Sequence, residues 1–238
     1  MESINLALIT GVDIPIPECR LTVHQPSIKE ISVMGEREFF RGVQTICISK
    51  PMDRNDLANI SNFQIFMKIV MDKAEKDRKQ NVLDTLFILF PKYKVTILPR
   101  SLLFNIDNEN IIIDENNFSS LQEVLRQISC LNGSKGDQFN PGNAAAAEIA
   151  RKLERGRQRV AAQKQGAGNN ASVFSQYLSI LSVGLHMSLQ DLSNLTVYQF
   201  YDLIDRYTLY INWDLDLRQR LAGGTPDSKP DNWMKIIH

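Results

Sequence analysis

Two pairs of aspartates come nearest to residues that could do acid–base chemistry. Asp202 and Asp205 are three positions apart, and Asp214 and Asp216 are two apart. On a helix, residues three apart share a face and residues two apart do not, so only the first pair could act together. Arg206 follows that pair directly, which favours a salt-bridged surface over a general acid and base. The sequence therefore predicts no catalytic residue and no enzyme.

Patterns for metal ions and cofactors are also missing from the sequence. The three histidines stand far apart and form no ligand set, and no two cysteines have the CxxC spacing of a zinc site. The run that starts at Asp53 has the acids of a calcium loop, but Ala58 and Gln64 occupy the positions that need glycine and glutamate. Phosphate-binding and dinucleotide-binding glycine motifs are not found. We expect no metal and no cofactor.

Length and charge set wide limits on the class of protein. The 238 residues allow one or two domains with a sizeable core. The 27 basic residues balance 27 acidic ones, which argues against a general binder of polyanions. The chain has three widely separated cysteines, an odd number, so we expect reduced and mostly buried thiols at Cys19, Cys47 and Cys130.

The start of the chain and its apolar runs favour a soluble intracellular protein. Residues 1–8 contain Glu2 and no basic residue, unlike a signal peptide. The longest apolar runs, such as 86–90, are far too short to cross a bilayer. We therefore expect no membrane contact.

The order of helices and strands expected over residues 1–131 predicts an α+β domain with a small antiparallel sheet. Pro15 and Pro17 predict an extended start over residues 1–25, with a strand at 19–24. Ser27 and Glu30 have the spacing of a capping box that begins a helix, and Gly35 predicts its interruption. Further helices are predicted at 62–77, 82–90 and 118–131, and further strands at 94–98, 102–106 and 111–113.

A linker is predicted over residues 132–170. It starts with a run rich in glycine and polar residues at 132–143. An alanine-rich helix at 144–165 follows, with few large apolar residues and an excess of basic ones. Two interpretations remain open: an exposed connecting helix, or an arm that binds an acidic protein surface or nucleic acid. The basic residues that would carry the second interpretation include Arg151, Lys152, Arg155, Arg157 and Arg159.

Residues 171–238 predict a helical domain with a C-terminal tail. Helices are expected over 172–184, 189–194 and 197–221, with capping boxes at Ser188 and Thr196 and a possible break at Gly184. This order resembles a helix-turn-helix, but Arg206 is the only base on the face that would read DNA. The apolar end of the chain should dock on the helices or in a partner groove through Trp233, Met234, Ile236 and Ile237. The whole chain is thus predicted to be α+β and mainly helical.

Three segments resemble proteins of tailed phages. The segments AEIARKLERGRQRVAAQK and YLSILSVGLHMSLQDLSNLTVYQFYDLIDRY are similar to the C-terminal parts of phage tail assembly chaperones. The opening PIPECRLTVHQPSIKEISVMGEREFF resembles the start of small tail or baseplate assembly proteins. The resemblance is a pattern of segments over most of the chain and not a single diagnostic motif.

The resemblance implies a non-enzymatic assembly chaperone that binds tape-measure or hub proteins in the host cytoplasm. A structural tail or baseplate subunit of the virion, and a nucleic-acid binder that uses residues 151–164, are the alternatives. Other phage tail proteins are the expected partners, a homo-oligomer is left open, and nucleic acid is disfavoured. The candidate partner-binding residues are Arg151, Lys152, Arg155, Arg157, Arg159, Trp233, Met234 and Ile237.

Overall fold

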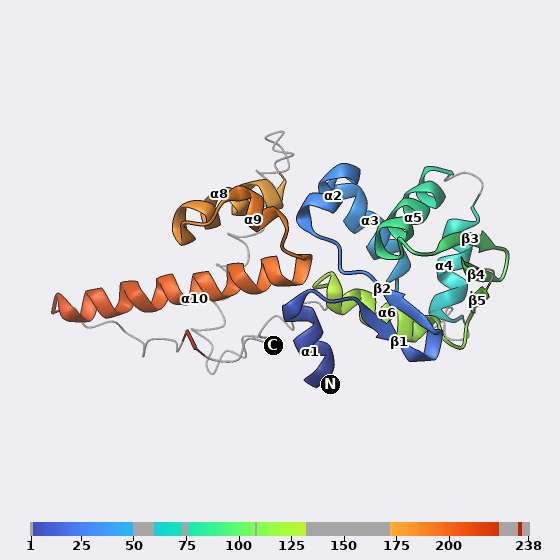
Figure 1. Cartoon of the computed structure of the whole chain (residues 1–238), viewed down its shortest axis with the longest axis horizontal. Coiled ribbons are helices and arrows are strands. Elements are labelled where there is room, and N and C mark those ends of the chain that lie inside the picture. The colour runs from blue at the N-terminus through green and yellow to red at the C-terminus, as the bar shows by residue number, and fades with distance from the viewer. Residues whose placement is uncertain are drawn as a thin grey trace, which may run out of the picture.

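The chain folds into an α+β structure that is mainly helical, as the sequence predicts. A computed structural model describes residues 2–49, 60–72, 76–107, 109–131, 172–223 and 233–234. Figure 1 shows the C-terminal helices at one end of the molecule and the sheet formed by residues 94–113 at the other. The predicted linker 132–170, with its basic helix, lies outside the described residues, as does the run from Asp53 to Ala58.

The first residues form a helix and a hairpin, so the prediction of an extended start is wrong for α1 (Glu2–Thr10). Strand β1 (Ile14–Ile16) pairs antiparallel with β2 (Leu21–Val23) through the short helix η1 (Pro17–Cys19). The predicted strand at 19–24 is therefore shorter, because Cys19 belongs to η1. Pro15 and Pro17 restrict the backbone only locally. They keep the hairpin extended but do not prevent a helix at residues 2–10.

Helix α2 (Ile28–Met34) begins with the predicted capping box. The Ser27 hydroxyl accepts from the Glu30 amide at 3.2 Å, and the Ser27 amide donates to the Glu30 carboxylate at 2.8 Å. Gly35 ends the helix with φ at 98°, a conformation that favours glycine, and α3 (Glu36–Ile46) follows at once. The predicted interruption at Gly35 is therefore confirmed.

The helix predicted over 62–77 is divided in the structure. Helix α4 (Asn62–Val70) ends at Met71, and α5 (Lys76–Leu89) begins five residues later. The predicted helix at 82–90 is the second half of α5. No glycine or proline marks the break, so the sequence gives no local signal for it. Helix α5 packs on α3 and α4, which explains why the chain turns back there.

The predicted antiparallel sheet is confirmed. It consists of β3 (Lys94–Leu98), β4 (Ser101–Ile106) and β5 (Glu109–Ile113) in sequential order. Phe104 pairs with Val95 on one side and with Ile111 on the other, and this row faces the core. Helix α6 (Phe118–Ile128) follows and buries Phe118, Leu121, Leu125 and Ile128.

Helices α8 (Val173–Leu185), α9 (Leu189–Ser193) and α10 (Val197–Leu221) agree closely with the predicted ranges. Thr196 forms the predicted capping box with Gln199. Ser188 accepts from the Asp191 amide, but the Asp191 carboxylate accepts from the Ser188 hydroxyl and not from the backbone, so this box is only half formed. Gly184 does not break α8, which continues to Leu185.

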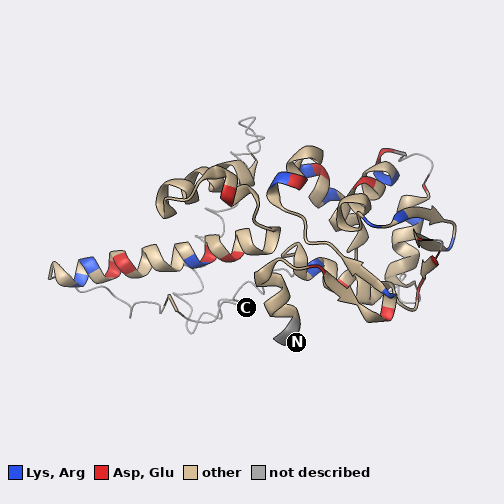
Figure 2. Cartoon of the chain, viewed as in Figure 1, with Lys and Arg blue, Asp and Glu red and all other residues tan. Residues whose placement is uncertain are grey.

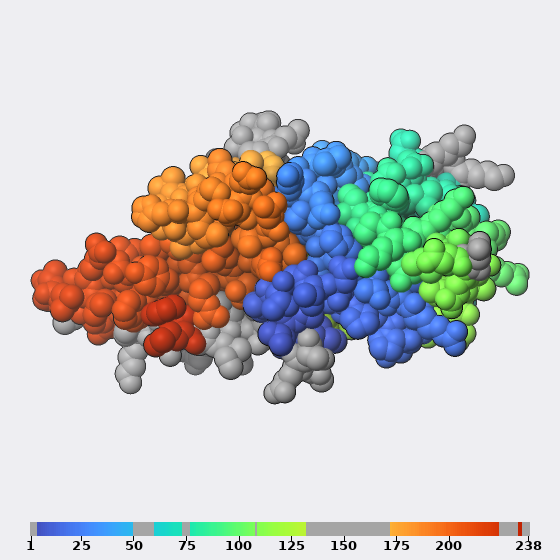
Figure 3. Space-filling model, in the orientation of Figure 1, coloured from blue at the N-terminus to red at the C-terminus, as the bar shows by residue number. Residues whose placement is uncertain are grey.

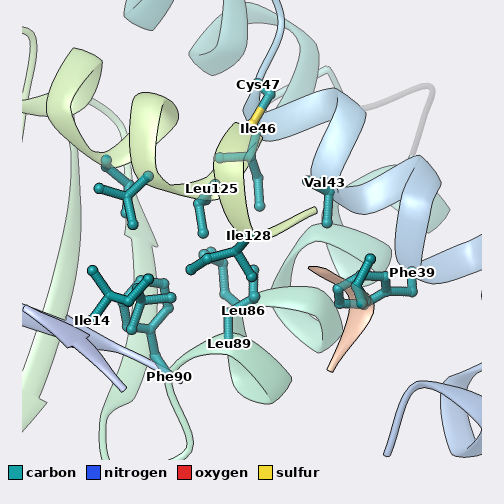
Figure 4. Packing of buried hydrophobic residues seen from close by; sticks show 14 of the residues in the cluster. Ile14, Phe39, Val43, Ile46, Cys47, Leu86, Leu89, Phe90, Leu125 and Ile128 are labelled. Carbon is teal, nitrogen blue, oxygen red and sulfur yellow. The ribbon is translucent and has the colours of Figure 1, made fainter. Parts of the chain in front are cut away.

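One hydrophobic cluster joins the N-terminal and C-terminal parts of the described chain. Figure 4 shows its N-terminal side, where Phe39 and Val43 of α3 approach Leu86 of α5 and Ile128 of α6. Backbone contacts also cross between the two parts: the Ile28 amide donates to the Leu195 carbonyl at 3.0 Å. The two parts are therefore packed together and are not separated on a long tether.

Candidate protein-binding surface

The N-terminal end of α8 is held by an acidic residue from α3. The Glu36 carboxylate accepts from the Ser172 hydroxyl and from the Phe174 amide, the latter at 3.2 Å. A carboxylate at a helix N-terminus satisfies free amides and complements the helix dipole. Glu36 thereby fixes where α8 begins relative to the N-terminal part.

Aromatic packing fixes the inner side of α8. The Phe174 ring is 5.8 Å from the Phe40 ring of α3 and 5.4 Å from the Phe200 ring of α10, centroid to centroid. Further along, Gly184 leaves room for the Tyr207 ring, since a side chain at Gly184 would clash with the Tyr207 hydroxyl. The inner side of α8 is thus occupied along its whole length.

The outer side of α8 is exposed and uncharged, and it includes four large apolar residues. We define the outer face of α8 as Val173, Tyr177, Ile180 and Val183, of which Ile180 is 50% exposed and Val183 is 75% exposed. Helical spacing in the sequence predicts that Val173 and Tyr177 lie on the same apolar stripe as Leu181. The structure corrects this: Leu181 is fully buried, whereas Val173 is 41% exposed and Tyr177 is 36% exposed. Because α8 packs on the core with the side that carries Leu181, its other apolar residues are exposed to solvent.

Helix α8 carries no charged residue in its 13 positions. Figure 2 shows this as a ribbon without blue or red, next to charged residues on α9 and α10. Exposed helices normally carry charges on their solvent side, whereas the cores of protein interfaces are depleted of them. In Figure 3 the C-terminal helices form one end of the molecule.

The end of the chain docks on α10. The Trp233 ring is 5.6 Å from Tyr210 and 6.4 Å from Trp213, centroid to centroid, and the Trp233 carbonyl accepts from Arg206 at 2.7 Å. The neighbouring Met234 is 68% exposed. The sequence left two positions open for this apolar end, the helices of its own chain or a groove of a partner. In the structure Trp233 packs against the helices of its own chain.

Most of the predicted partner-binding residues lie outside the described part of the chain. These are Arg151, Lys152, Arg155, Arg157, Arg159 and Ile237. The outer face of α8 was not identified from the sequence as a binding surface. The signal that could have found it is the uncharged run from Ser172 to Gln190.

The helix-turn-helix interpretation does not fit the structure. A DNA-binding protein of that kind inserts the first turns of its second helix into the major groove. Here Tyr198 is buried at that position on α10, and the Gln199 side chain donates to the carbonyl of Ile9 at 2.8 Å. Because α1 lies against the first turns of α10, this surface is not available to DNA.

Burial keeps the thiols and one nearby phenol protonated at neutral pH. It raises the pKa of the Cys47 thiol to about 12 and that of Cys19 to about 11. Burial, together with the negative charges of Asp205 and Asp202, raises the pKa of the Cys130 thiol to about 12. Burial is also the main cause that raises the pKa of the Tyr201 phenol to about 12. All three cysteines are free thiols, as predicted, and Cys19 and Cys47 are buried.

Among the described residues, no cluster of three His, Cys, Asp or Glu side chains could hold a metal ion. None of the described helices is long and apolar enough to cross a membrane.

Residues 165–238 match the protein family described as YomV second domain. This family is phage-derived, from a Bacillus prophage protein, so the match points to a phage origin for this part of the chain. No curated protein and no solved structure matches the chain. The matched span contains α8, α9 and α10, and therefore the outer face of α8.

Proposed function

We propose that the protein is a non-enzymatic assembly chaperone of a tailed phage that binds other tail proteins, such as a tape-measure or hub protein. The single observation that supports this most is the uncharged, exposed outer face of α8. It lies in the segment that matches a phage-derived family, and its composition is that of a protein interface.

The chemistry of this face favours a helical partner. Val173, Ile180 and Tyr177 follow helical spacing along α8, so they present ridges into which the side chains of a second helix can pack. A face without charges has little electrostatic selectivity, and its affinity comes from the apolar area that the partner covers. Such a chaperone would act in the host cytoplasm while the tail is assembled.

Co-expression with the long helical tail protein of the same phage tests the proposal. The full chain should purify as a complex with that protein. Replacing Ile180 or Val183 by aspartate should abolish the complex, because a charge would be buried at the centre of the interface. Ile112→Asp is the matched control: Ile112 on β5 is 54% exposed, and β5 lies at the end of the molecule opposite α8 (Figure 1). If the α8 variants bind as well as the control does, the outer face of α8 is not the binding surface.

A structural subunit of the tail or baseplate would use the same face but keep it covered permanently. Mass spectrometry of purified particles separates the two roles. A chaperone that leaves after assembly is absent from the particle, whereas a structural subunit is present in a fixed ratio to the other tail proteins.

A further inference from the structure

The two edges of the sheet formed by β3, β4 and β5 differ in how they are closed. Strand β4 lies in the middle, so β5 is one edge and β3 is the other. At the β5 edge, the Ile112 carbonyl accepts from the Asn117 side chain at 3.1 Å, and η1 packs beside the strand. An edge that is covered in this way is a poor template for another chain.

The β3 edge has no such cover within the described part of the chain. Leu98 and Ser101 pair across the turn, and in an antiparallel ladder only every second residue hydrogen-bonds to the same neighbour. The residues between, Val95 and Ile97, therefore direct their N–H and C=O groups away from β4. The same alternation accounts for the outward carbonyl of Ile112 on β5. None of the described residues hydrogen-bonds to the outward groups of β3.

The side chains of β3 suit the addition of one more strand. Val95, Thr96 and Ile97 are β-branched, a type that packs well on the neighbouring residues of a sheet. Thr96 is exposed, whereas Ile97 is buried and holds the strand on the core. A further strand can thus bond to this edge without taking any side chain out of the core, which is the mode of recognition called β-strand addition.

Two basic residues flank the β3 edge. Lys94 begins the strand and Arg100 lies in the turn after it, and both are exposed. Neither forms an ion pair with a described residue. Arg100 shares a groove with Asp114 and Glu115, but these acids are too far from it to form an ion pair. Acidic side chains on an added strand would therefore be attracted at both ends of β3.

A second copy of this chain fits the β3 edge poorly. Antiparallel pairing that uses both outward residues is centred on Thr96. Lys94 of each copy then lies opposite Leu98 and close to Arg100 of the other copy. Bases would meet bases at both ends of the contact, and like charges across strands are destabilising.

We propose that the β3 edge binds an extended acidic segment of a partner protein as an additional strand of the sheet. The backbone of the segment bonds to the outward N–H and C=O groups of Val95 and Ile97, and its acidic side chains lie near Lys94 and Arg100. The sheet is at the opposite end of the molecule from the outer face of α8 (Figure 1), so this second site is independent of the function proposed above.

NMR of the full chain with synthetic peptides tests the proposal. Two short peptides alternate valine and threonine, and one carries aspartate at both ends while the other carries lysine. The acidic peptide should shift the amide signals of Val95 and Ile97 and slow the exchange of these amides. It should bind at least ~10-fold more tightly than the basic peptide. Methylation of its central backbone nitrogens should remove most of the binding, because these groups can then no longer donate hydrogen bonds.

Charge reversal on the protein is the second test. Lys94→Glu combined with Arg100→Glu should weaken binding of the acidic peptide at least ~10-fold and strengthen binding of the basic one. Lys29→Glu is the matched control, since Lys29 is exposed on α2, and it should change neither affinity. Unchanged Val95 and Ile97 signals at ~1 mM acidic peptide, or equal affinity for the two peptides, would overturn the proposal. Slower exchange of these amides when the protein alone is concentrated would also overturn it, because a second copy would then cover the edge.

Discussion

The Tyr207 ring occupies the space where a side chain on Gly184 would lie. This contact sets the distance between α8 and α10 at the end of α8, where small residues let two helices approach closely. It also explains why a glycine is present inside a helix, where it otherwise costs stability. The sequence alone suggested that Gly184 would interrupt α8, whereas the structure shows that it permits close packing.

Gly184→Ala should destabilise the protein by about 1–3 kcal/mol, because the added methyl group overlaps the Tyr207 hydroxyl and forces the helices apart. Chemical denaturation measures the change. Tyr207→Phe removes the hydroxyl, so the double variant should be more stable than the sum of the two single effects predicts. Ser179→Ala on the exposed side of α8 is the control and should change stability by less than about 0.5 kcal/mol. A Gly184→Ala protein as stable as this control would contradict the contact.

Glu36→Gln should loosen the start of α8. The carboxylate accepts from Ser172 and from the Phe174 amide, and a neutral amide group is a weaker acceptor at a helix N-terminus. The expected loss of stability is about 1 kcal/mol. Hydrogen exchange should report faster exchange at the first turn of α8, while α5 in the N-terminal part stays protected.

Glu123→Gln is the matched control for Glu36. Glu123 is exposed on α6 and accepts from Gln127 on the same helix. Its replacement should leave the exchange of α8 unchanged. Equal protection of α8 in the two variants would show that Glu36 does not hold the helix.

Stability should fall in acid because of two carboxylates around His24. Burial alone would raise the pKa of Asp13, but hydrogen bonds with His24 and Lys92 outweigh it and hold that pKa below 3.8. Burial likewise opposes the shift at Glu30, where hydrogen bonds with Ser27 and His24 hold the pKa below 4.5. A lowered folded pKa stabilises the protein above the unfolded pKa, and this contribution is lost as the pH falls through the folded value.

Urea unfolding between pH 6 and pH 3 measures this contribution. The double variant Asp13→Asn, Glu30→Gln should lose less stability over that range than the wild type, because two of the titrating groups are gone. At pH 6 the variant should be the less stable of the two. Identical pH dependence of the two proteins would show that these carboxylates do not link folding to protonation.

Local signals in the sequence identified many helix and strand boundaries correctly. The capping residues Ser27 and Thr196 mark helix starts because a side-chain oxygen must satisfy a free amide, and that requirement is local. The strands β3 to β5 were predictable because turn residues separate short alternating runs. For the same reason the overall class, mainly helical α+β, could be predicted.

Features that depend on distant residues were not predictable. The only local signal we find for helix α1 is Gly11 at its C-terminal end, and its buried Leu8 packs in a core that includes residues from the other end of the chain. The break between α4 and α5 has no local signal. The candidate surface was missed because the sequence shows that α8 has apolar residues on two sides but not which side Glu36 and Phe40 will cover.

The contact between α1 and α10 has a consequence for synthesis of the protein. The Ile9 carbonyl and the Gln199 side chain that binds it are 190 positions apart in the chain. A ribosome makes roughly 5–20 residues per second, so α1 would wait about 10 seconds or more for its partner. Until then the apolar side of α1 is open to water and to other nascent chains. Early termination before α10 should therefore yield an aggregation-prone product and not a smaller folded protein.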